Sequence, residues 1–327
     1  MKPIHRRQLL HLTAGAAALP VMSRGFARAE AYPTRPVRLV VGYAPGGNND
    51  TIARLVGQSL SERLGQQFFV ENRPGAGTNI ATEAAVNAPA NGYTLLLVGP
   101  ANAINATLYK KLNFNFIRDI APVGGVVRLP LVMVINPSLP AKTVPDFITY
   151  AKANPGKINM ASAGIGSAPH VSGELFKMMA GVDMVHVPYR GDGPALTDFI
   201  GGHVQVYFSG LAPSLDHFKT GTLRPLGVTT TGRSDALPNV PTIGEFISGY
   251  EASTSFGVGA PKNTPLHIVE KLNIEINAAL ADSKLRSKLA DFAGTMLPGS
   301  PSDFGKLIAE ETEKWGKVVK FASIRPE

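Results

Sequence analysis

The sequence predicts an α/β protein built from two doubly wound units. From residue 36 onward, short apolar β-type runs alternate with helical stretches, and glycine-containing loops join each run to the helix that follows. This alternation is typical of βαβ units with parallel strands and right-handed crossovers. Removal of an N-terminal signal of 29 residues from the 327 would leave 298, about twice the usual size of one domain.

Residues 1–29 have the features of an export signal. Arg6 and Arg7 supply a positive start, residues 9–22 are mostly apolar but too short to span a bilayer, and an A-x-A cleavage site ends at Ala29. The paired arginines fit the twin-arginine route, although signals of the general secretory route also carry such pairs. We therefore expect export to the periplasm with cleavage near Ala29.

The composition excludes several classes of function. The formal net charge is +8, but the signal holds five of the basic residues and no acids, which leaves +3 for the mature chain. No basic run with interleaved aromatics follows, so a nucleic-acid partner is not expected. Cysteine is absent, which excludes disulfides, thiol nucleophiles and thiolate metal sites. No later segment has the length and hydropathy of a membrane helix.

The β-type runs divide into two groups along the chain. The runs expected in the first unit are residues 37–41, 68–70 and 93–98. Those expected in the second unit are residues 158–162, 184–189, 204–208 and 224–230. Two longer runs, 127–137 and 253–261, are expected to cross between the units as a hinge. The predicted domains are therefore residues 30–130 plus 257–327 for the first and residues 131–256 for the second.

Helix starts are marked by capping patterns. Thr143 and Ser300 each precede an aspartate by three residues, which is the spacing of a capping box. Thr264 stands before a proline and is predicted to cap the amphipathic helix that begins there. This helix and the C-terminal amphipathic helix are expected to pack as outer helices of the first unit.

The strand-to-helix loops are the candidate binding site, because ligands of open α/β sheets lie beyond the carboxyl ends of the strands. In the loop after residues 37–41, two adjacent glycines let backbone amides approach a bound oxygen at a positive helix start. Asp50 fits a first-turn cap or a group that orients a ligand hydroxyl or water. The candidates in this loop are Ala44, Gly46, Gly47, Asn48 and Asp50.

Two further loops of the first unit add candidates. In the loop at residues 72–81, Thr78 and Asn79 open the next helix, and Thr78 fits an N-cap and a ligand contact equally well. The loop at residues 99–105 is polar and contributes Asn102. Together these loops predict a polar pocket at one edge of the first sheet.

The loop at residues 162–170 is the corresponding candidate in the second unit. It offers backbone donors at a helix start, and its pattern approaches G-x-G-x-x-G. Pro169 stands at the third glycine position and the loop comes late in the chain, so a dinucleotide site is not expected. His170 fits a local structural group or a ligand contact. The candidates are Gly164, Gly166, Ser167 and His170.

A later strand ends at Tyr189, which is a further candidate for ligand contact. Its neighbour Arg190 could hold a carboxylate with two parallel hydrogen bonds, but a surface pair with Asp192 is favoured. Signatures of enzymes are missing: the chain has no G-x-S-x-G elbow, no HExxH and no P-loop lysine motif, and its histidines lack metal spacing. We predict a binding cleft without catalytic residues, metal or cofactor.

Six short motifs stand in an order that resembles a known family. They are YPTRPVRLVVGYAPGGNNDTIAR, VENRPGAG, NGYTLLL, HVPYRGDGPALTDFIGGHV, GRSDALPNVPTIGE and GVGAPKNTP. The mature chain resembles the periplasmic solute-binding receptors of tripartite tricarboxylate transporters, the Bug or TctC-like family. The resemblance implies a hinged fold of the type II periplasmic-binding-protein kind that closes on a small organic carboxylate. It also implies membrane permease subunits as partners, and we expect a monomer.

The resemblance also implies that backbone amides and ordered waters hold the carboxylate. By position it carries over to candidates from three of the loops: Gly46, Gly47, Asn48, Asp50, Thr78, Asn79, Gly164, Gly166, Ser167 and His170. The chain departs from the family at Thr78 and Ala81, where glycine is usual, and a larger side chain there would narrow the first pocket. It also has Ser253 to Ser255 before Phe256, where an aromatic residue is common.

The leading hypothesis is thus a receptor that captures a carboxylate and presents its closed form to a permease. One alternative is a periplasmic α/β enzyme that processes a carboxylate, with Asp50 and His170 as acid and base. The other is a sensory subunit that passes the closed form to a signalling partner. The sequence does not identify the carboxylate.

Overall fold

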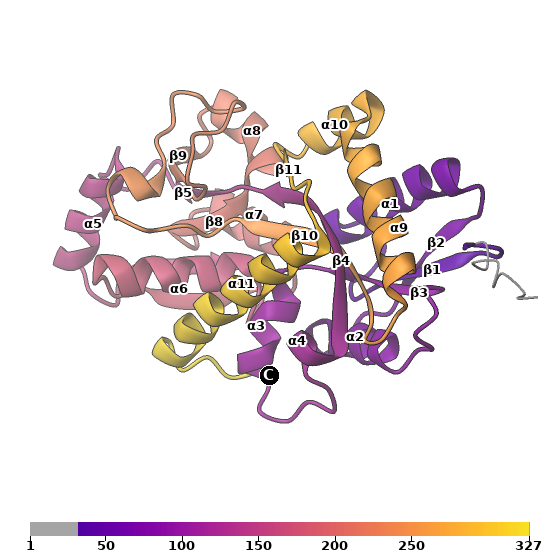
Figure 1. Cartoon of the computed structure of the whole chain (residues 1–327). Coiled ribbons are helices and arrows are strands. Elements are labelled where there is room, and N and C mark those ends of the chain that lie inside the picture. The colour runs from indigo at the N-terminus through magenta and orange to yellow at the C-terminus, as the bar shows by residue number, and fades with distance from the viewer. Residues whose placement is uncertain (1–31, 327) are drawn as a thin grey trace, which may run out of the picture. The chain divides into compact units, whose positions relative to one another are not determined.

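The computed structural model describes residues 32–326, whose strands form two sheets (Figure 1). The predicted export signal, residues 1–29, lies outside the described residues. We call each sheet with its helices a lobe. The predicted α/β architecture of two wound units is confirmed.

The first lobe has a six-stranded sheet in the order β11-β4-β10-β3-β1-β2. Its strands are β1 (Val37–Val41), β2 (Phe68–Asn72), β3 (Thr94–Val98), β4 (Ile120–Leu129), β10 (Thr254–Pro261) and β11 (Thr295–Met296). Its helices are α1 (Asn48–Leu64), the 3₁₀ turn η1 (Ala76–Thr78), α2 (Asn79–Val86), α3 (Pro100–Leu108), α4 (Phe116–Asp119), α9 (Leu266–Ala281), α10 (Ser283–Ala290) and α11 (Pro301–Phe321).

The second lobe has a five-stranded sheet in the order β7-β6-β8-β5-β9. Its strands are β5 (Leu131–Ile135), β6 (Asn159–Ser162), β7 (Val185–Pro188), β8 (Val206–Gly210) and β9 (Arg224–Val228). Its helices are α5 (Val144–Ala153), α6 (Ala168–Ala180), α7 (Asp192–Ile200), α8 (Leu211–Lys219) and the 3₁₀ turn η2 (Ile243–Glu245). Each β-type run predicted from the sequence forms a strand.

The strands of the βαβ units run parallel as predicted, whereas the strands at the crossings pair antiparallel. β1 is parallel to β2 and β3, and β6 is parallel to β7 and β8. However, β10 is antiparallel to β3 and β4, and β5 is antiparallel to β8 and β9. The cause is topological: β4 carries the chain out of the first sheet and its neighbour β10 carries it back, so the two strands have opposite directions.

The two crossings can be located by residue. The run 127–137 divides at Pro130, which has no N–H to continue a strand ladder. On the return, Ala252 N donates to the carbonyl of Thr229 in the second lobe, and Thr254 then pairs with Leu129 in the first. At each crossing the chain therefore passes from one sheet to the other within a few residues. The exact domain limits stay a prediction.

The predicted helix starts are confirmed in two of three places. Thr143 and Ser300 form capping boxes at α5 and α11. Thr264 does not cap α9: its hydroxyl donates to the carbonyl of Pro261 at 2.7 Å, and Pro265 occupies the cap position. The hydroxyl has a nearer acceptor in the preceding turn, so the capping pattern was misleading there.

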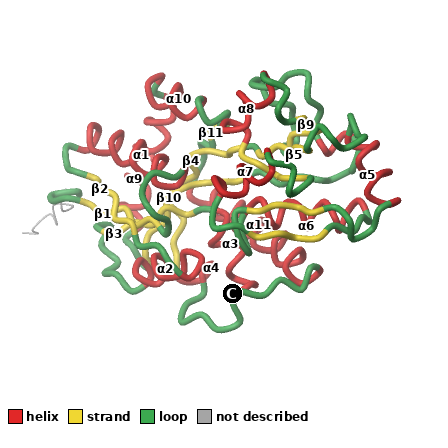
Figure 2. The backbone as a smooth tube through the Cα atoms, turned by 180° about the vertical axis from the view of Figure 1, so that it is seen from behind, coloured by secondary structure: helices red, strands yellow, loops and turns green. Residues whose placement is uncertain are grey.

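Helix α11 contacts both lobes, as Figures 1 and 2 show where it passes α3 and α6. One hydrophobic cluster contains Ile104 and Leu108 of α3, Trp315 of α11 and Phe176 of α6. This shared core places α3 of the first lobe beside the start of α6 in the second. Within the described part of the chain, no helix has both the length and the hydropathy that a membrane crossing demands.

Candidate functional site

Three loops of the first lobe meet at the carboxyl ends of β1 and β3. A small cavity there is lined by residues from all three loops, among them Tyr43, Asn49, Thr78, Gly99 and Asn102. The loops are in close contact, because a Cβ atom added at Gly42 would lie 2.4 Å from the Cβ of Thr78. The structure therefore brings the first-lobe candidates together, as the parallel order of β1, β2 and β3 requires.

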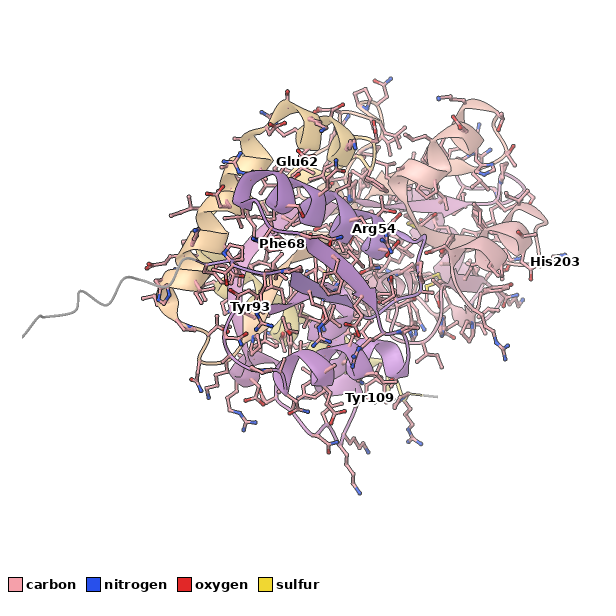
Figure 3. The ribbon with its side chains drawn as sticks, turned by 90° about the vertical axis from the view of Figure 1, so that its right-hand side faces the viewer. Arg54, Glu62, Phe68, Tyr93, Tyr109 and His203 are labelled. Carbon is pink, nitrogen blue, oxygen red and sulfur yellow. The ribbon has the colours of Figure 1, made fainter. Side chains whose placement is uncertain are left out.

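Asp50 stabilises the loop between β1 and α1. Its carboxylate accepts hydrogen bonds from Gly46 N at 3.0 Å, Arg54 Nε at 2.9 Å and Asn72 Nδ2 at 3.0 Å. Arg54 projects from α1, as Figure 3 shows. The hydrogen bond from Arg54 contributes most to lowering the pKa of the buried Asp50 to about 2. These contacts are those of a structural brace, which agrees with the capping alternative for this acid.

The rest of this loop faces solvent. Ala44, Gly46, Gly47 and Asn48 are exposed. A Cβ atom added at Gly47 would meet nothing within 4 Å, and its φ of −85° suits any residue. The first-turn N–H groups of α1 have no intrahelical acceptors, so they remain available at the positive end of the helix dipole.

Thr78 occupies the N-cap position of α2 but does not cap it. Its φ is +82°, in the left-handed region, and its side chain makes no capping bond. The side chain is nearly fully buried, and its Oγ1 has no hydrogen-bond partner among residues 32–326. Glycine adopts this backbone conformation readily, whereas a β-branched residue does so at a cost. Thr78 keeps the glycine conformation and adds a buried, unpaired hydroxyl.

Asn79 is buried beside Thr78, and only one of its two side-chain polar atoms has a hydrogen-bond partner. Its Oδ1 accepts a hydrogen bond from Asn105 Nδ2 at 3.1 Å, whereas its Nδ2 finds no acceptor within the described range. Asn102 is different, because its Oδ1 accepts from Gly99 N at 2.8 Å and its Nδ2 donates to Thr82 Oγ1 at 2.8 Å. Both polar ends of Asn102 are thus engaged within the first lobe.

The candidate donors of the second lobe already have acceptors inside their own loop. Gly166 N donates to His170 Nδ1 and Gly164 N to Ser162 Oγ, each at 3.1 Å. Ser167 caps α6, since its Oγ accepts from His170 N at 3.4 Å. This loop is therefore closed on itself by hydrogen bonds.

The two candidate loops approach each other across α3. A Cβ atom at Gly166 would lie 2.6 Å from Leu108 Cδ2 at the end of α3, and one at Gly77 would lie 3.1 Å from the hydroxyl of Tyr109, labelled in Figure 3. The second lobe acts on Tyr43 through the charge of Asp192 on α7. Although Tyr43 is 39% exposed, loss of hydration around its phenol, and next that charge, raise the pKa of Tyr43 to about 12.

Tyr43, which lines the first-lobe cavity, and Asn105, which donates to Asn79, were not among the residues predicted from the sequence. Tyr43 stands within the quoted GYAPGG motif, so its position beside the glycine pair was the available signal. The predicted contact residue Tyr189 is engaged within the second lobe, because its hydroxyl donates to Asp198 Oδ2 on α7 at 2.8 Å.

The favoured pair of Arg190 with Asp192 is wrong. Asp192 Oδ1 instead accepts from the hydroxyl of Tyr207, and the described residues offer Arg190 no ion-pair partner. The buried Tyr207 presents its hydroxyl to Asp192 at the start of α7, so the carboxylate already has a partner within its own lobe.

Two wound lobes joined by two crossings, with strand-to-helix loops gathered around α3, define a solute-binding receptor of the type II periplasmic-binding-protein kind. The sequence model of the family described as "Tripartite tricarboxylate transporter family receptor" (TctC) matches residues 52–324. The chain belongs to this family. Because the family consists of receptors, the enzyme alternative is set aside.

Individual proteins of this family are similar over nearly the whole chain. Protein BugT of Bordetella pertussis is 36% identical over 311 residues, covering 94% of this chain and 93% of BugT. The structure of R. palustris Rpa4515 with adipate has a TM-score of 0.80 and 38% identity, covering 90% of this chain and all of that one. MatC from Rhodopseudomonas palustris with bound malate has a TM-score of 0.76 and 29% identity, covering 88% and 100%.

Proposed function

We propose that the chain is a monomeric periplasmic receptor that binds a small organic carboxylate between its lobes and presents it to the permease subunits of a tripartite tricarboxylate transporter. The observation that carries this proposal is the pair of buried, unpartnered polar atoms, Thr78 Oγ1 and Asn79 Nδ2, at the loops of the first lobe. The adipate and malate bound to the two similar structures support a carboxylate as the ligand class.

The pair has an energetic cost that a ligand would offset. A buried polar group without a partner costs about 1–3 kcal/mol, and a left-handed backbone at a β-branched residue such as Thr78 costs about 1–3 kcal/mol more. A threonine hydroxyl and an asparagine NH₂ can both donate to a carboxylate oxygen. The nearby starts of α1 and α2 favour negative charge. An anionic acceptor is therefore the partner that these groups lack.

Closure of the lobes follows from a ligand that touches both. Such a ligand binds the closed form more tightly than the open form, and this difference shifts the population. Gly166 already lies against α3 of the first lobe, so the loop after β6 is placed to complete the site. Export to the periplasm is supported by the features of residues 1–29, which match a cleavable signal.

A thermal-shift screen of carboxylates, with adipate and malate included, tests the ligand class. A ligand at one hundred times its dissociation constant adds about 2.7 kcal/mol to the free energy of unfolding. We expect at least one acid to raise the unfolding midpoint. No shift with any acid would contradict the carboxylate proposal.

A bulky residue at Gly47 tests the location of the site. We expect Gly47→Leu to abolish binding of that acid in calorimetry while the protein stays folded, because the added side chain enters open space. Gly232→Leu is the matched control, since a Cβ atom there also meets nothing within 4 Å and the residue lies away from the first-lobe loops. Unchanged affinity in Gly47→Leu would exclude this loop.

A further inference from the structure

Two stacked histidines lie behind the second-lobe loop. The rings of His170 on α6 and His186 on β7 are 3.6 Å apart between centroids and nearly parallel, at 7°. His170 is only 4% exposed. Each ring contacts a different part of the loop, since His170 Nδ1 receives Gly166 N and His186 Nε2 lies 2.6 Å from Ser162 Oγ. The stack therefore supports the loop at both of its ends.

The hydrogen bonds define the protonation of both rings. Because His170 Nδ1 accepts from Gly166 N, the ring carries its proton on Nε2. Ser162 Oγ also lies 3.2 Å from the carbonyl of Gly164, so it can donate to that carbonyl while it accepts from Nε2–H of His186. This arrangement is compatible with two neutral Nε2–H rings, whose stacking brings no charge repulsion.

We infer that His170 and His186 are positioning residues that hold the loop of residues 162–168 in its ligand-receiving shape, and that protonation of the pair releases this shape and the ligand. The inference rests on the proposed function. It assigns His170 an action through Gly166 rather than on the ligand. In this loop the amides left to bind a ligand are those of Ile165 and Ala168, because their N–H groups have no acceptor in the described structure.

Acid acts on this arrangement through His170 Nδ1. A proton on that atom removes the acceptor of Gly166 N, so protonation and the observed loop geometry exclude each other. Burial lowers the pKa of His170 to about 3 and that of His186 to about 4. Burial and, in addition, the positive charge of Lys177 therefore keep both rings neutral at pH 7.

The charged groups that face the rings come from three places, one of which is the helix of His170 itself. Glu174 and Lys177 lie on α6, Asp183 precedes β7, and Arg325 follows α11; all of them line a cavity of about 500 Å³ together with both rings. Lys177 donates to Glu174 at 3.0 Å, and Glu174 Oε1 is 3.9 Å from His170 Nε2. The positive charge of Lys177 opposes protonation of both rings, whereas the negative charge of Glu174 favours it.

Asparagine and glutamine substitutions separate positioning from mere packing. Asparagine can place an acceptor where Nδ1 of histidine lies, and glutamine can place a donor where Nε2 lies. His170→Asn and His186→Gln therefore keep the needed group, whereas the swapped pair, His170→Gln and His186→Asn, loses it. All four variants remove the aromatic stack equally, so the two pairs serve as controls for each other.

The first readout is amide hydrogen exchange in the ligand-free, full-length mature chain. We expect the amides of Gly164 and Gly166 to exchange about tenfold faster in the swapped pair than in the retaining pair, the size of one lost hydrogen bond. Circular dichroism verifies folding of every variant. Equal exchange in all four folded variants would overturn the inference.

The second readout is the dissociation constant of the acid that gives the largest thermal shift with the natural chain. We expect the retaining pair to bind it about tenfold more tightly than the swapped pair. We also expect the natural chain to lose affinity more steeply than the retaining pair as the pH falls from about 5 to about 3, the range in which the two rings take up protons. The same fall in affinity from pH 5 to 3 in the natural chain and in the retaining pair would overturn the acid-release claim. If the natural chain binds no carboxylate, the proposed function fails, and the exchange data still decide on the role of the pair.

Discussion

The two lobes present similar glycine-containing loops but prepare them in opposite ways. In the first lobe, Thr78 and Asn79 keep polar atoms buried and unpaired. In the second lobe, Ser162, Ser167 and His170 accept hydrogen bonds from the loop's own backbone. One loop is therefore incomplete without a ligand, and the other is assembled in advance.

This difference shows how a hinged receptor can divide recognition. Unpaired groups lower the stability of the ligand-free first lobe, so a ligand gains affinity by satisfying them. A preassembled second loop loses little conformational entropy when the lobes close on the ligand. Each lobe should then respond to mutation and to pH in its own way.

Acid should produce the largest effect and act on the second lobe first. Burial lowers the pKa of His170 and His186 in the folded protein from 6.5 to about 3 and about 4. Their stabilising contribution is complete above pH 6.5 and is lost as the pH falls, by about 1.4 kcal/mol per ring and pH unit. Asp50, with its pKa lowered from 3.8 to about 2, loses its contribution only below pH 3.8.

Urea unfolding at pH 7, 6, 5 and 4 measures this loss. The double variant His170→Asn/His186→Gln should show a flatter dependence between pH 6.5 and 4, because the titrating rings are gone. A slope that is the same in both proteins would remove the histidines as its cause.

Removal of a hydroxyl from the second-lobe loop should destabilise the protein. Ser167→Ala deletes the N-cap of α6, and such a deletion costs about 1 kcal/mol of the free energy of unfolding. Urea unfolding at pH 7 without ligand checks the value. No change would mean that this loop is not held by its own hydrogen bonds.

Removal of a hydroxyl from the first-lobe loop should have the opposite and smallest effect. Thr78→Val keeps the shape of the side chain and removes the buried, unpaired Oγ1. We expect the ligand-free protein to gain about 0.5 kcal/mol, since an unsatisfied polar group disappears, while carboxylate binding weakens in calorimetry. A loss of stability like that of Ser167→Ala would erase the contrast between the lobes.

Much of the fold could be predicted because period and capping are local. The strands near residues 37, 94 and 206 and the capping boxes at Thr143 and Ser300 follow from short patterns. The antiparallel direction of β10 could not be predicted, because it depends on a chain return that joins residues 254–261 to residues 120–129. Local patterns contain no information on that pairing.

The site was predictable as a set of loops but not as a set of contacts. The glycine pairs located the loops, yet the left-handed backbone of Thr78 and the hydrogen bonds of Gly164 and Gly166 depend on neighbours distant in the sequence. The partner of Asp192 was unpredictable for the same reason. Its carboxylate accepts from the hydroxyl of Tyr207, which is distant in sequence, and not from the neighbouring Arg190.

A crystal structure of the mature chain with the acid that stabilises it most tests the account directly. It should show a carboxylate oxygen within hydrogen-bond distance of Asn79 Nδ2 and Thr78 Oγ1, with Gly166 still donating to His170. An acid bound elsewhere, with Thr78 Oγ1 and Asn79 Nδ2 unpaired as before, would contradict it.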